Sequence, residues 1–309
     1  MILCCGEALI DMIPKPTLAD TDGYVPYTGG AIFNTAVGLG RLGVQVSMLS
    51  GVSTDLFGQQ LEAALSASNV NTSSLIRSDR PTTLAFVQLN EGHASYTFYD
   101  ENSAGRTIKI PDLPAVPIDT TALYFGGISL CSEPAASTYQ ALQAREASSR
   151  VIMMDPNIRA NFVEDVEKYR TRIAAMIALS DIVKVSDEDL NWIYPGPESL
   201  NDKVNAIRAA GPSIVILTQG AEGSSAFLAD QTRVTAAVER VEVVDTVGAG
   251  DTFNAGFLAK LSELGLLTKD ALKSASGEDV RSALKYGAKV AAVTVSRAGA
   301  NPPWRHELT

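Results

Sequence analysis

The chain has 309 residues, 46% of them hydrophobic and 19% charged, and 35 acidic residues against 25 lysines and arginines give a formal net charge of −10. The length allows one large domain or a domain with a lid. The negative charge and the lack of a basic run argue against nucleic acid and acidic membranes as partners. Three cysteines without disulfide or metal-binding spacing, and only two histidines, argue against a disulfide scaffold, a histidine-ligated metal and a Ser–His–Asp triad.

The start of the chain and its cysteines predict a cytoplasmic protein. Met1–Glu7 has no basic region and meets an acidic residue early, unlike a secretory signal. No apolar run reaches the length of a membrane span, and unpaired cysteines favour a reducing compartment. We therefore expect a soluble protein whose partners are small molecules, without nucleic acid or membrane contacts.

Apolar, β-rich runs alternate with helical patterns along almost the whole chain. Buried strands are predicted at Ile2–Cys5, Val44–Leu49, Leu123–Phe125, Val151–Met154, Ile182–Val185 and Ile214–Leu217. Helices are predicted at Asn34–Leu42, Phe57–Ala67, Ala135–Arg145, Val166–Leu179, Asn201–Ala210, Asp251–Leu264 and Val280–Val293. This alternation predicts an α/β fold with a parallel sheet covered by helices on both faces.

Two regions depart from the alternation. Met12–Thr28 is short and aromatic, and Thr82–Tyr99 contains two alternating runs around the turn Asn90–Gly92, which is typical of a hairpin. Four antiparallel strands inserted at these two places would form a small sheet that covers the active site; an edge extension of the main sheet is the alternative. We expect a main domain of residues 1–11, 30–74 and 111–309, and a lid of residues 12–29 and 75–110.

The heptad Asp245–Asp251 is the segment with the clearest chemical meaning. It follows a β-branched run (Val241, Val243, Val244) and precedes a small-residue helical pattern, so we expect a strand, a glycine turn and a helix. The first N–H groups of such a helix lack partners and form an anion site. Asp251 beside them either caps the helix or takes part in chemistry, and the pattern alone leaves both open.

Other nucleotide-binding and hydrolase motifs are missing from the sequence. A P-loop needs a Gly-Lys pair, and the chain has none. A dinucleotide fold needs a glycine-rich turn after the first strand, where only Gly6 is present, and there is no Gly-x-Ser-x-Gly elbow. The phosphate-handling turn is therefore expected near the C-terminus.

The heptad, continued by Asn254–Gly256, resembles the second signature of the ribokinase-like (PfkB) sugar kinases. Gly29–Ala36, with Gly43 further on, resembles their first signature. The resemblance covers essentially the whole chain, and four further segments are similar to the bacterial fructokinases of that family: Gly6–Asp11, Phe98–Tyr99, Asp155–Arg159 and Lys184–Glu188. It implies a three-layer α/β/α sandwich with a mostly parallel central sheet and a small inserted β-sheet lid.

The resemblance assigns roles to residues of the two signatures. Asp251 would be the general base that accepts the proton of a primary sugar hydroxyl, and the amides of Gly248, Ala249 and Gly250 would bind the transferring phosphoryl group. The helix N-terminus should lower the pKa of Asp251. Asp11, expected at the end of the first strand, would bind the sugar together with Gly30, Asn34, Arg159 and Asp251. The alternatives are a solvated turn residue before Pro14 for Asp11, a helix cap for Asn34, which the residue alone would favour, and a surface arginine for Arg159.

The resemblance also implies ATP with Mg²⁺, and a monovalent cation such as K⁺. The nucleotide would contact Lys184, Thr218, Gly220, Gly223, Gly248 and Gly250, although the segment around Gly220 on its own is an ordinary turn. The monovalent cation would be held by Asp245, Val247, Thr294, Arg297 and Gly299. Ser186 and Asp189 replace the asparagine and glutamate common in the family, which leaves the magnesium-water shell unassigned. Ile32 and Ser53 are smaller departures, from proline and glycine.

The expected reaction is the phosphorylation of D-fructose to D-fructose 6-phosphate. The main alternative is a kinase for 2-keto-3-deoxygluconate, whose carboxylate needs a cation. Asp100 stands after Phe98–Tyr99 where those enzymes have an arginine, which favours a neutral sugar. A kinase for another sugar or a nucleoside, and a catalytically silent sugar-binding protein, are further alternatives. The exposed face of the lid predicts a homodimer.

Overall fold

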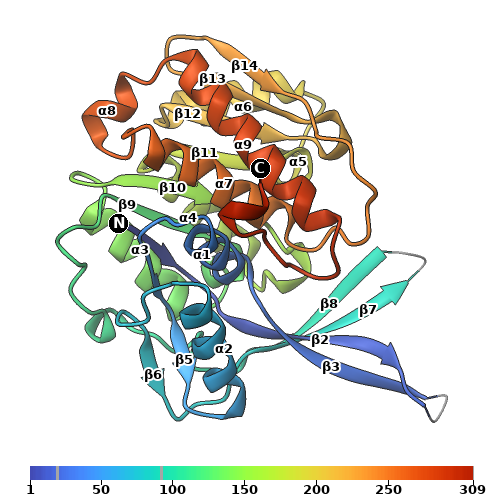
Figure 1. The fold of residues 1–309 in the computed structure, drawn as a ribbon. Coiled ribbons are helices and arrows are strands. Elements are labelled where there is room, and N and C mark those ends of the chain that lie inside the picture. Colours follow the sequence, from blue (N-terminus) through green and yellow to red (C-terminus); the bar gives the residue numbers. More distant parts are fainter. Residues whose placement is uncertain (19–20, 91–92, 309) are drawn as a thin grey trace.

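The computed structural model describes residues 1–18, 21–90 and 93–308. Its largest element is an eight-stranded sheet in the order β14-β13-β12-β11-β10-β9-β1-β4 (Figure 1). The strands from β4 to β12 run parallel, β13 is antiparallel to β12, and β14 is antiparallel to β13. The six buried strands predicted for the main sheet are confirmed within two residues: β1 (Ile2–Cys5), β4 (Val46–Leu49), β9 (Ala122–Gly126), β10 (Val151–Asp155), β11 (Ile182–Ser186) and β12 (Ile214–Thr218). They are followed by β13 (Ser224–Leu228) and β14 (Arg233–Ala236).

Helices cover both faces of this sheet, because alternate residues of each strand point to opposite sides. Ile2 and Cys4 of β1 belong to one buried cluster with α1 (Ala31–Arg41), α2 (Leu56–Ala67), α7 (Ala249–Glu263) and α9 (Gly277–Val295). Leu3 and Cys5 belong to a second cluster with α3 (Ala135–Glu146), α4 (Val166–Ala178) and α6 (Leu200–Ala210). The three-layer arrangement and all the predicted helices are confirmed.

Short helical segments complete the main body. Two helices were not predicted from the sequence, α5 (Asp187–Ile193) and α8 (Lys269–Lys273), because they are too short to show an apolar period. Single 3₁₀ turns lie at Ile110–Asp112, Gly127–Leu130, Ala160–Phe162, Gly220–Glu222 and Arg305–Glu307.

A second, four-stranded sheet projects from the main body (Figure 1). Its order is β3 (Asp22–Gly29), β2 (Leu9–Pro16), β7 (Leu84–Asn90) and β8 (His93–Tyr99), so the two inserted segments do meet in a separate sheet. The expectation of four antiparallel strands was wrong. The hairpins β2–β3 and β7–β8 lie side by side through their first strands, so β2 and β7 pair in parallel.

The expected lid segments do not coincide with the strands of the second sheet. Strand β2 begins at Leu9, before the expected boundary at residue 12, and β6 (Ile76–Ser78) pairs with β5 (Gly51–Ser53) in a two-stranded sheet of its own. Residues 91 and 92 of the predicted turn lie outside the described residues. The division into a main domain and a lid stays a prediction.

The strand expected directly before the heptad is not formed. Val241, Val243 and Val244 are exposed and belong to a segment that leaves the main sheet after β14. The amides of Val244 and Asp245 both donate to the carbonyl of Val295, which attaches the segment to the end of α9. A β-branched run was misread here because the segment crosses between elements and has no strand edge beside it.

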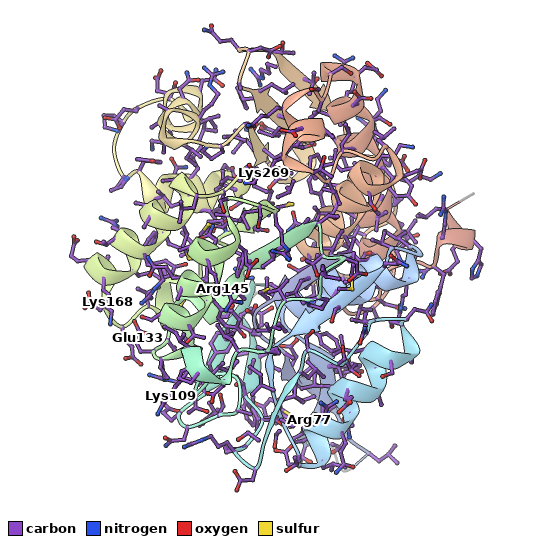
Figure 2. All side chains as sticks on the ribbon, turned by 90° about the vertical axis from the view of Figure 1, so that its left-hand side faces the viewer. Arg77, Lys109, Glu133, Arg145, Lys168 and Lys269 are labelled. Atoms are coloured by element: carbon purple, nitrogen blue, oxygen red, sulfur yellow. The ribbon has the colours of Figure 1, made fainter. Side chains whose placement is uncertain are left out.

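Charged side chains cover the outside of the helical layers. Before α3, for example, Glu133 pairs with Lys168 of α4 at 2.8 Å (Figure 2). Within the described part of the chain, no helix combines the length and the apolarity that a membrane crossing needs.

Candidate active site

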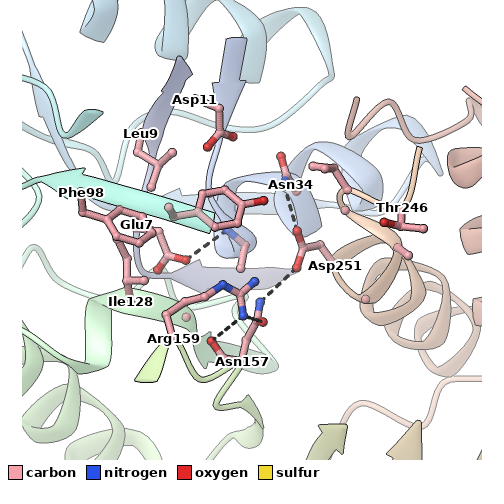
Figure 3. A pocket seen from close by; sticks show the side chains of 18 residues that line it. Glu7, Leu9, Asp11, Asn34, Phe98, Ile128, Asn157, Arg159, Thr246 and Asp251 are labelled. Carbon is pink, nitrogen blue, oxygen red and sulfur yellow. Dashed lines mark hydrogen bonds between the residues drawn. The ribbon is translucent and has the colours of Figure 1, made fainter. Parts of the chain in front are cut away.

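A cavity of about 250 Å³ opens between the two sheets, where parallel strands of the main sheet end (Figure 3). Both sheets contribute to its wall. The second sheet supplies Leu9 and Asp11 of β2 and Tyr96 and Phe98 of β8. The main body supplies the start of α1, the turns after β9 and β10, and the heptad: Gly30, Ala31, Asn34, Gly127, Ile128, Asn157, Arg159 and Thr246–Asp251.

The carboxylate of Asp251 is held on both of its oxygens (Figure 3). Nδ2 of Asn34 donates to Oδ2 at 2.9 Å, and Nδ2 of Asn157 donates to Oδ1 at 3.4 Å. Gly248 is the N-cap of α7, so Asp251 stands in the first turn and does not cap the helix with its side chain. The capping interpretation is therefore wrong, and the carboxylate faces the cavity.

Burial raises the pKa of Asp251 to about 6, assisted by the charge of Asp155. The hydrogen bond from Asn34 and the charges of Arg159 and Lys184 act in the opposite direction. The expected lowering by the helix N-terminus was wrong, because the loss of water around the carboxylate outweighs the favourable groups. A carboxyl group with a pKa near 6 is a better proton acceptor than an exposed aspartate.

The glycine turn presents free N–H groups beside this carboxylate. Gly248 has a φ of 77°, and a Cβ there would lie 2.6 Å from Cβ of Ala300, so only glycine fits the turn. The amide of Ala249 donates to the carbonyl of Thr246 at 3.3 Å. In the described chain the amides of Gly248 and Gly250 make no such bond, which leaves these two of the three expected donors available for an anion.

Asp11, Gly30, Asn34 and Arg159 all line the cavity, as the sugar-binding assignment requires. The expected location of Asp11 was wrong: it lies in β2 of the second sheet, because the chain leaves the first strand at Cys5. Burial and the charge of Asp251 raise the pKa of Asp11 to about 7.

The turn after β10 connects Arg159 to Asp251 through a residue that the sequence analysis did not select. Nη1 of Arg159 donates to Oδ1 of Asn157 at 2.7 Å, while the amide of Asn157 reaches Asp251. Asn157 has a φ of 43°, a backbone conformation that asparagine tolerates better than most residues. It was visible in the sequence as part of the Asp155–Arg159 turn, but only Arg159 was given a role.

Several other wall residues were given no role from the sequence, among them Glu7, Tyr96 and Phe98. Oε1 of Glu7 accepts from the amide of Ala31 at 3.1 Å and Oε2 from that of Ser129 at 3.3 Å, which ties the start of α1 to the turn after β9. Tyr96 and Phe98 stack with ring centroids 6.0 Å apart on one face of β8. Their alternating positions in the predicted hairpin could have identified them.

Asp100 does not face this cavity, so the argument from it for a neutral sugar was wrong. Strand β8 ends at Tyr99, and the buried carboxylate of Asp100 accepts from the hydroxyls of Thr83 (2.6 Å) and Ser103 (2.8 Å). Arg106 shares a separate small cavity with it. Asp100 and Arg106 therefore have a structural role at the base of the second sheet.

The residues expected to bind the nucleotide lie along the same edge of the main sheet. Lys184 lines a second groove of about 360 Å³, which shares Asn157 and Arg159 with the first cavity. A Cβ on Gly250 would lie 3.4 Å from Nζ of Lys184, so the lysine stands beside the glycine turn. Further along the edge, at and after the end of β12, lie Thr218, Gly220 and Gly223, which line neither cavity.

The structure brings together part of the expected cation set. Asp245 accepts from the amides of Val247 (3.0 Å) and Gly299 (2.9 Å). The carbonyl of Thr294 accepts from the amide of Arg297 at 3.0 Å, and the Arg297 side chain turns away to pair with Glu307 at 2.7 Å. Asp245 therefore joins the loop of Val247 to the loop of Gly299, and its carboxylate oxygens are the ligand type that a hard cation prefers.

Asp189 acts as a local structural residue. One oxygen accepts from the amide of Ile158 at 2.9 Å, and the other completes a capping box with Ser186 at the start of α5. Among the described residues, no group of three or more His, Cys, Asp or Glu side chains could hold a metal ion.

Known proteins share this fold. The model of the PfkB family of carbohydrate kinases matches residues 1–307. A fructokinase of Rhizobium leguminosarum bv. trifolii is 50% identical over 282 residues, which cover 91% of this chain and 86% of the relative. The crystal structure of a Xylella fastidiosa fructokinase with bound ATP has a TM-score of 0.89 and 26% identity, covering 99% of this chain and 97% of that one.

A Vibrio cholerae fructokinase solved with fructose, ADP and a calcium ion has a TM-score of 0.85 and 26% identity, covering 97% of this chain and 94% of that one. The family match extends over both sheets and includes the glycine turn with Asp251. The chain belongs to the PfkB family of carbohydrate kinases.

Proposed function

We propose that the protein is a fructokinase, which transfers the terminal phosphoryl group of ATP to the primary hydroxyl at C6 of D-fructose. The observation that carries the proposal is the buried Asp251 carboxylate, held by Asn34 and Asn157 at a cavity wall beside the free amides of Gly248 and Gly250. The names of the relatives from Rhizobium leguminosarum, Xylella fastidiosa and Vibrio cholerae support the choice of sugar.

In the proposed reaction, Asp251 accepts the proton of the sugar hydroxyl as its oxygen bonds to the γ-phosphorus. The bond between that phosphorus and the β–γ bridging oxygen breaks, and ADP leaves with the electron pair. The amides of Gly248 and Gly250, which donate to no other backbone group in the described chain, would stabilise the charge on the transferring group. Lys184 supplies a positive charge beside Gly250.

The charges of the cavity favour a neutral sugar over a sugar acid. Glu7, Asp11 and Asp251 place three carboxyl groups on the wall against one guanidinium, Arg159. A carboxylate substrate such as 2-keto-3-deoxygluconate would meet more negative than positive charge. Hydroxyl groups, in contrast, donate well to carboxylate oxygens.

The metal ions belong to the same proposal. Mg²⁺ commonly binds through substrate phosphates and one or two protein carboxylates. The described residues offer no protein cage for a metal, so we expect Mg²⁺ to arrive on the nucleotide, where it neutralises phosphate charge. The nucleotide would meet Lys184 and the turn around Gly220. A monovalent cation would bind beside Asp245, where the loops of Val247 and Gly299 meet.

We also propose a homodimer formed through the outer face of the second sheet. Tyr24 and Tyr99 are 44% and 57% exposed and pack against Phe86 with ring centroids 5.0 and 5.4 Å apart. This aromatic face lies opposite the face that lines the cavity. A second copy of the same sheet is its natural cover, since the surface would be self-complementary about a two-fold axis.

A coupled assay of ADP release over a panel of sugars tests the proposed function. The panel contains fructose, glucose, ribose, a nucleoside and 2-keto-3-deoxygluconate, each with ATP and Mg²⁺. We expect turnover of fructose to exceed that of every other member. Turnover of 2-keto-3-deoxygluconate without fructose would overturn the substrate, and no turnover on any member would favour a silent binding protein.

A further inference from the structure

A buried ion pair lies beneath the glycine turn and outside the cavity wall. Nζ of Lys184 donates to Oδ2 of Asp155 at 3.0 Å, and the two side chains are 6% and 0% exposed. Moving such a pair out of water is expensive, so the pair is weak evidence for a role in stability alone. Its location next to the site therefore suggests another purpose.

The ammonium group of Lys184 has N–H donors that no acceptor in the described chain uses. An ammonium group carries three N–H donors, and within the described chain only Asp155 accepts from Lys184. The nearest atom to a Cβ built on Gly250 is Nζ of Lys184, at 3.4 Å. Two unused donors consequently stand beside the free amide of Gly250, where the proposed phosphate would bind.

Asp155 is itself fixed by the helix that carries the general base. Nδ2 of Asn254 donates to Oδ2 of Asp155 at 2.7 Å and to the hydroxyl of Tyr124 at 2.9 Å. Asn254 follows Asp251 by three residues in α7. The network thus joins α7 to β9, β10 and β11 directly below the phosphoryl-transfer centre.

We propose that Asp155 is a positioning residue for phosphoryl transfer: together with Asn254, it holds the Lys184 ammonium beside Gly250, where the free donors meet a phosphate of the nucleotide. The proposal rests on the kinase function proposed above. The carboxylates that face Lys184 are Asp155, Asp189 and Asp251. Burial lowers the pKa of Lys184, but these three charges outweigh burial and keep the lysine protonated.

The geometry offers a substitution that changes charge with little change in shape. Oδ2 of Asp155 accepts both hydrogen bonds, whereas Oδ1 is buried without a partner. In Asp155→Asn the amide oxygen can take the place of Oδ2, and the NH₂ group takes the place of Oδ1. The variant keeps both contacts and removes only the negative charge that holds Lys184.

A double-mutant cycle with Asp155→Asn and Lys184→Met tests the proposal. Lys184→Met should lower kcat/KM for ATP by on the order of 10²-fold, the usual effect of losing one donor to the reacting group. Asp155→Asn should lower it about 10-fold, because a neutral amide holds the lysine ammonium less strongly than a carboxylate, with KM for the sugar changed less than about 3-fold. Because Asp155 acts through Lys184, the double variant should be no worse than Lys184→Met alone.

A matched control is available at the other end of the same strands. Asp181 pairs with Lys269 at 2.6 Å (Lys269 is labelled in Figure 2), and Asp181→Asn should leave kcat/KM for ATP unchanged. Calorimetric titration of every variant with ADP measures nucleotide affinity, so the same double-mutant cycle can be evaluated without turnover. Any of three results would overturn the proposal. The losses in Asp155→Asn and Asp181→Asn could be equal, the losses in the double variant could be additive, or Asp155→Asn could leave both the kinetics and the ADP affinity unchanged. A parent protein that binds ADP but phosphorylates no sugar would instead refute the kinase function, and the ADP titrations would still decide the role of Asp155.

Discussion

The two sheets build opposite walls of one cavity in different ways. On the main-body side, hydrogen bonds fix Asp251, and the buried Lys184–Asp155 pair lies behind the glycine turn. On the side of the second sheet, Asp11 lies on a strand of a sheet whose opposite face exposes Tyr99. The hydrogen-bonded wall suits phosphoryl transfer, and the projecting sheet suits sugar recognition. Substitutions in the first should therefore change kcat, and substitutions in the second should change KM for the sugar.

Asp251→Asn should have the largest effect. The new amide keeps the size of the side chain but cannot accept a proton, so kcat should fall about 10³-fold or more, with KM for fructose within about 3-fold. Steady-state kinetics with purified variants measure both constants. A variant as active as the parent would remove Asp251 from the chemistry.

Asp11→Asn should have the next largest effect, and the constant that changes should be KM for fructose. Loss of a charged acceptor for sugar hydroxyls should raise KM for fructose about 10- to 100-fold, while kcat falls much less. The same kinetic assay measures it. A loss confined to kcat would contradict the division between the two walls.

Gly29→Ala should displace Asp11 without touching its chemistry. A Cβ on Gly29 would lie 2.1 Å from Oδ2 of Asp11, so the carboxylate must move, and we expect KM for fructose to rise about 10-fold. Gly23→Ala, in the same strand, meets chiefly a methyl group of Thr17 and should leave KM unchanged. Equal behaviour of the two variants would show that the position of Asp11 does not matter.

Tyr99→Ser should have the smallest effect on catalysis, because its ring points away from the cavity. The homodimer should weaken, with a dimer dissociation constant about 10-fold higher, since part of its apolar contact is lost. Sedimentation velocity at several concentrations measures this. Ile118→Ser, at a residue that is 98% exposed elsewhere, is the control; a monomeric parent, or equal weakening by both variants, would refute the interface.

The sequence predicted the central sheet and its helices well, because buried strands and amphipathic helices leave periodic patterns. It also selected Asp251, Gly30, Asn34 and Arg159, all of which line the cavity. Asp11 was selected but assigned to the wrong strand, since local patterns do not show where a chain leaves one sheet for another. Asp100 was misjudged because its orientation depends on the residue at which β8 ends.

The effects of burial on pKa values and on buried contacts could not be predicted from the sequence either. The pKa of Asp251 depends on the water excluded by residues from α1, β10 and α7, which lie far apart in the chain. Likewise, the pairing of Asp155 with Lys184 and Asn254 joins three segments that no local motif connects. Tertiary packing decides such features, and a sequence pattern reports only neighbours along the chain.

The pH dependence of kcat/KM for fructose tests most directly the claim that one ionised carboxylate on each wall is required. Burial raises the pKa of Asp251 to about 6 and that of Asp11 to about 7, and each group is active only when it has lost its proton. Activity should therefore be lost as the pH falls through both values: log kcat/KM should level off above pH 7 and approach a slope of two below pH 6. Asp11→Asn should retain a slope of one with its midpoint near pH 6. A parent profile that is flat between pH 5 and 8, or that falls as the pH rises, would contradict the account.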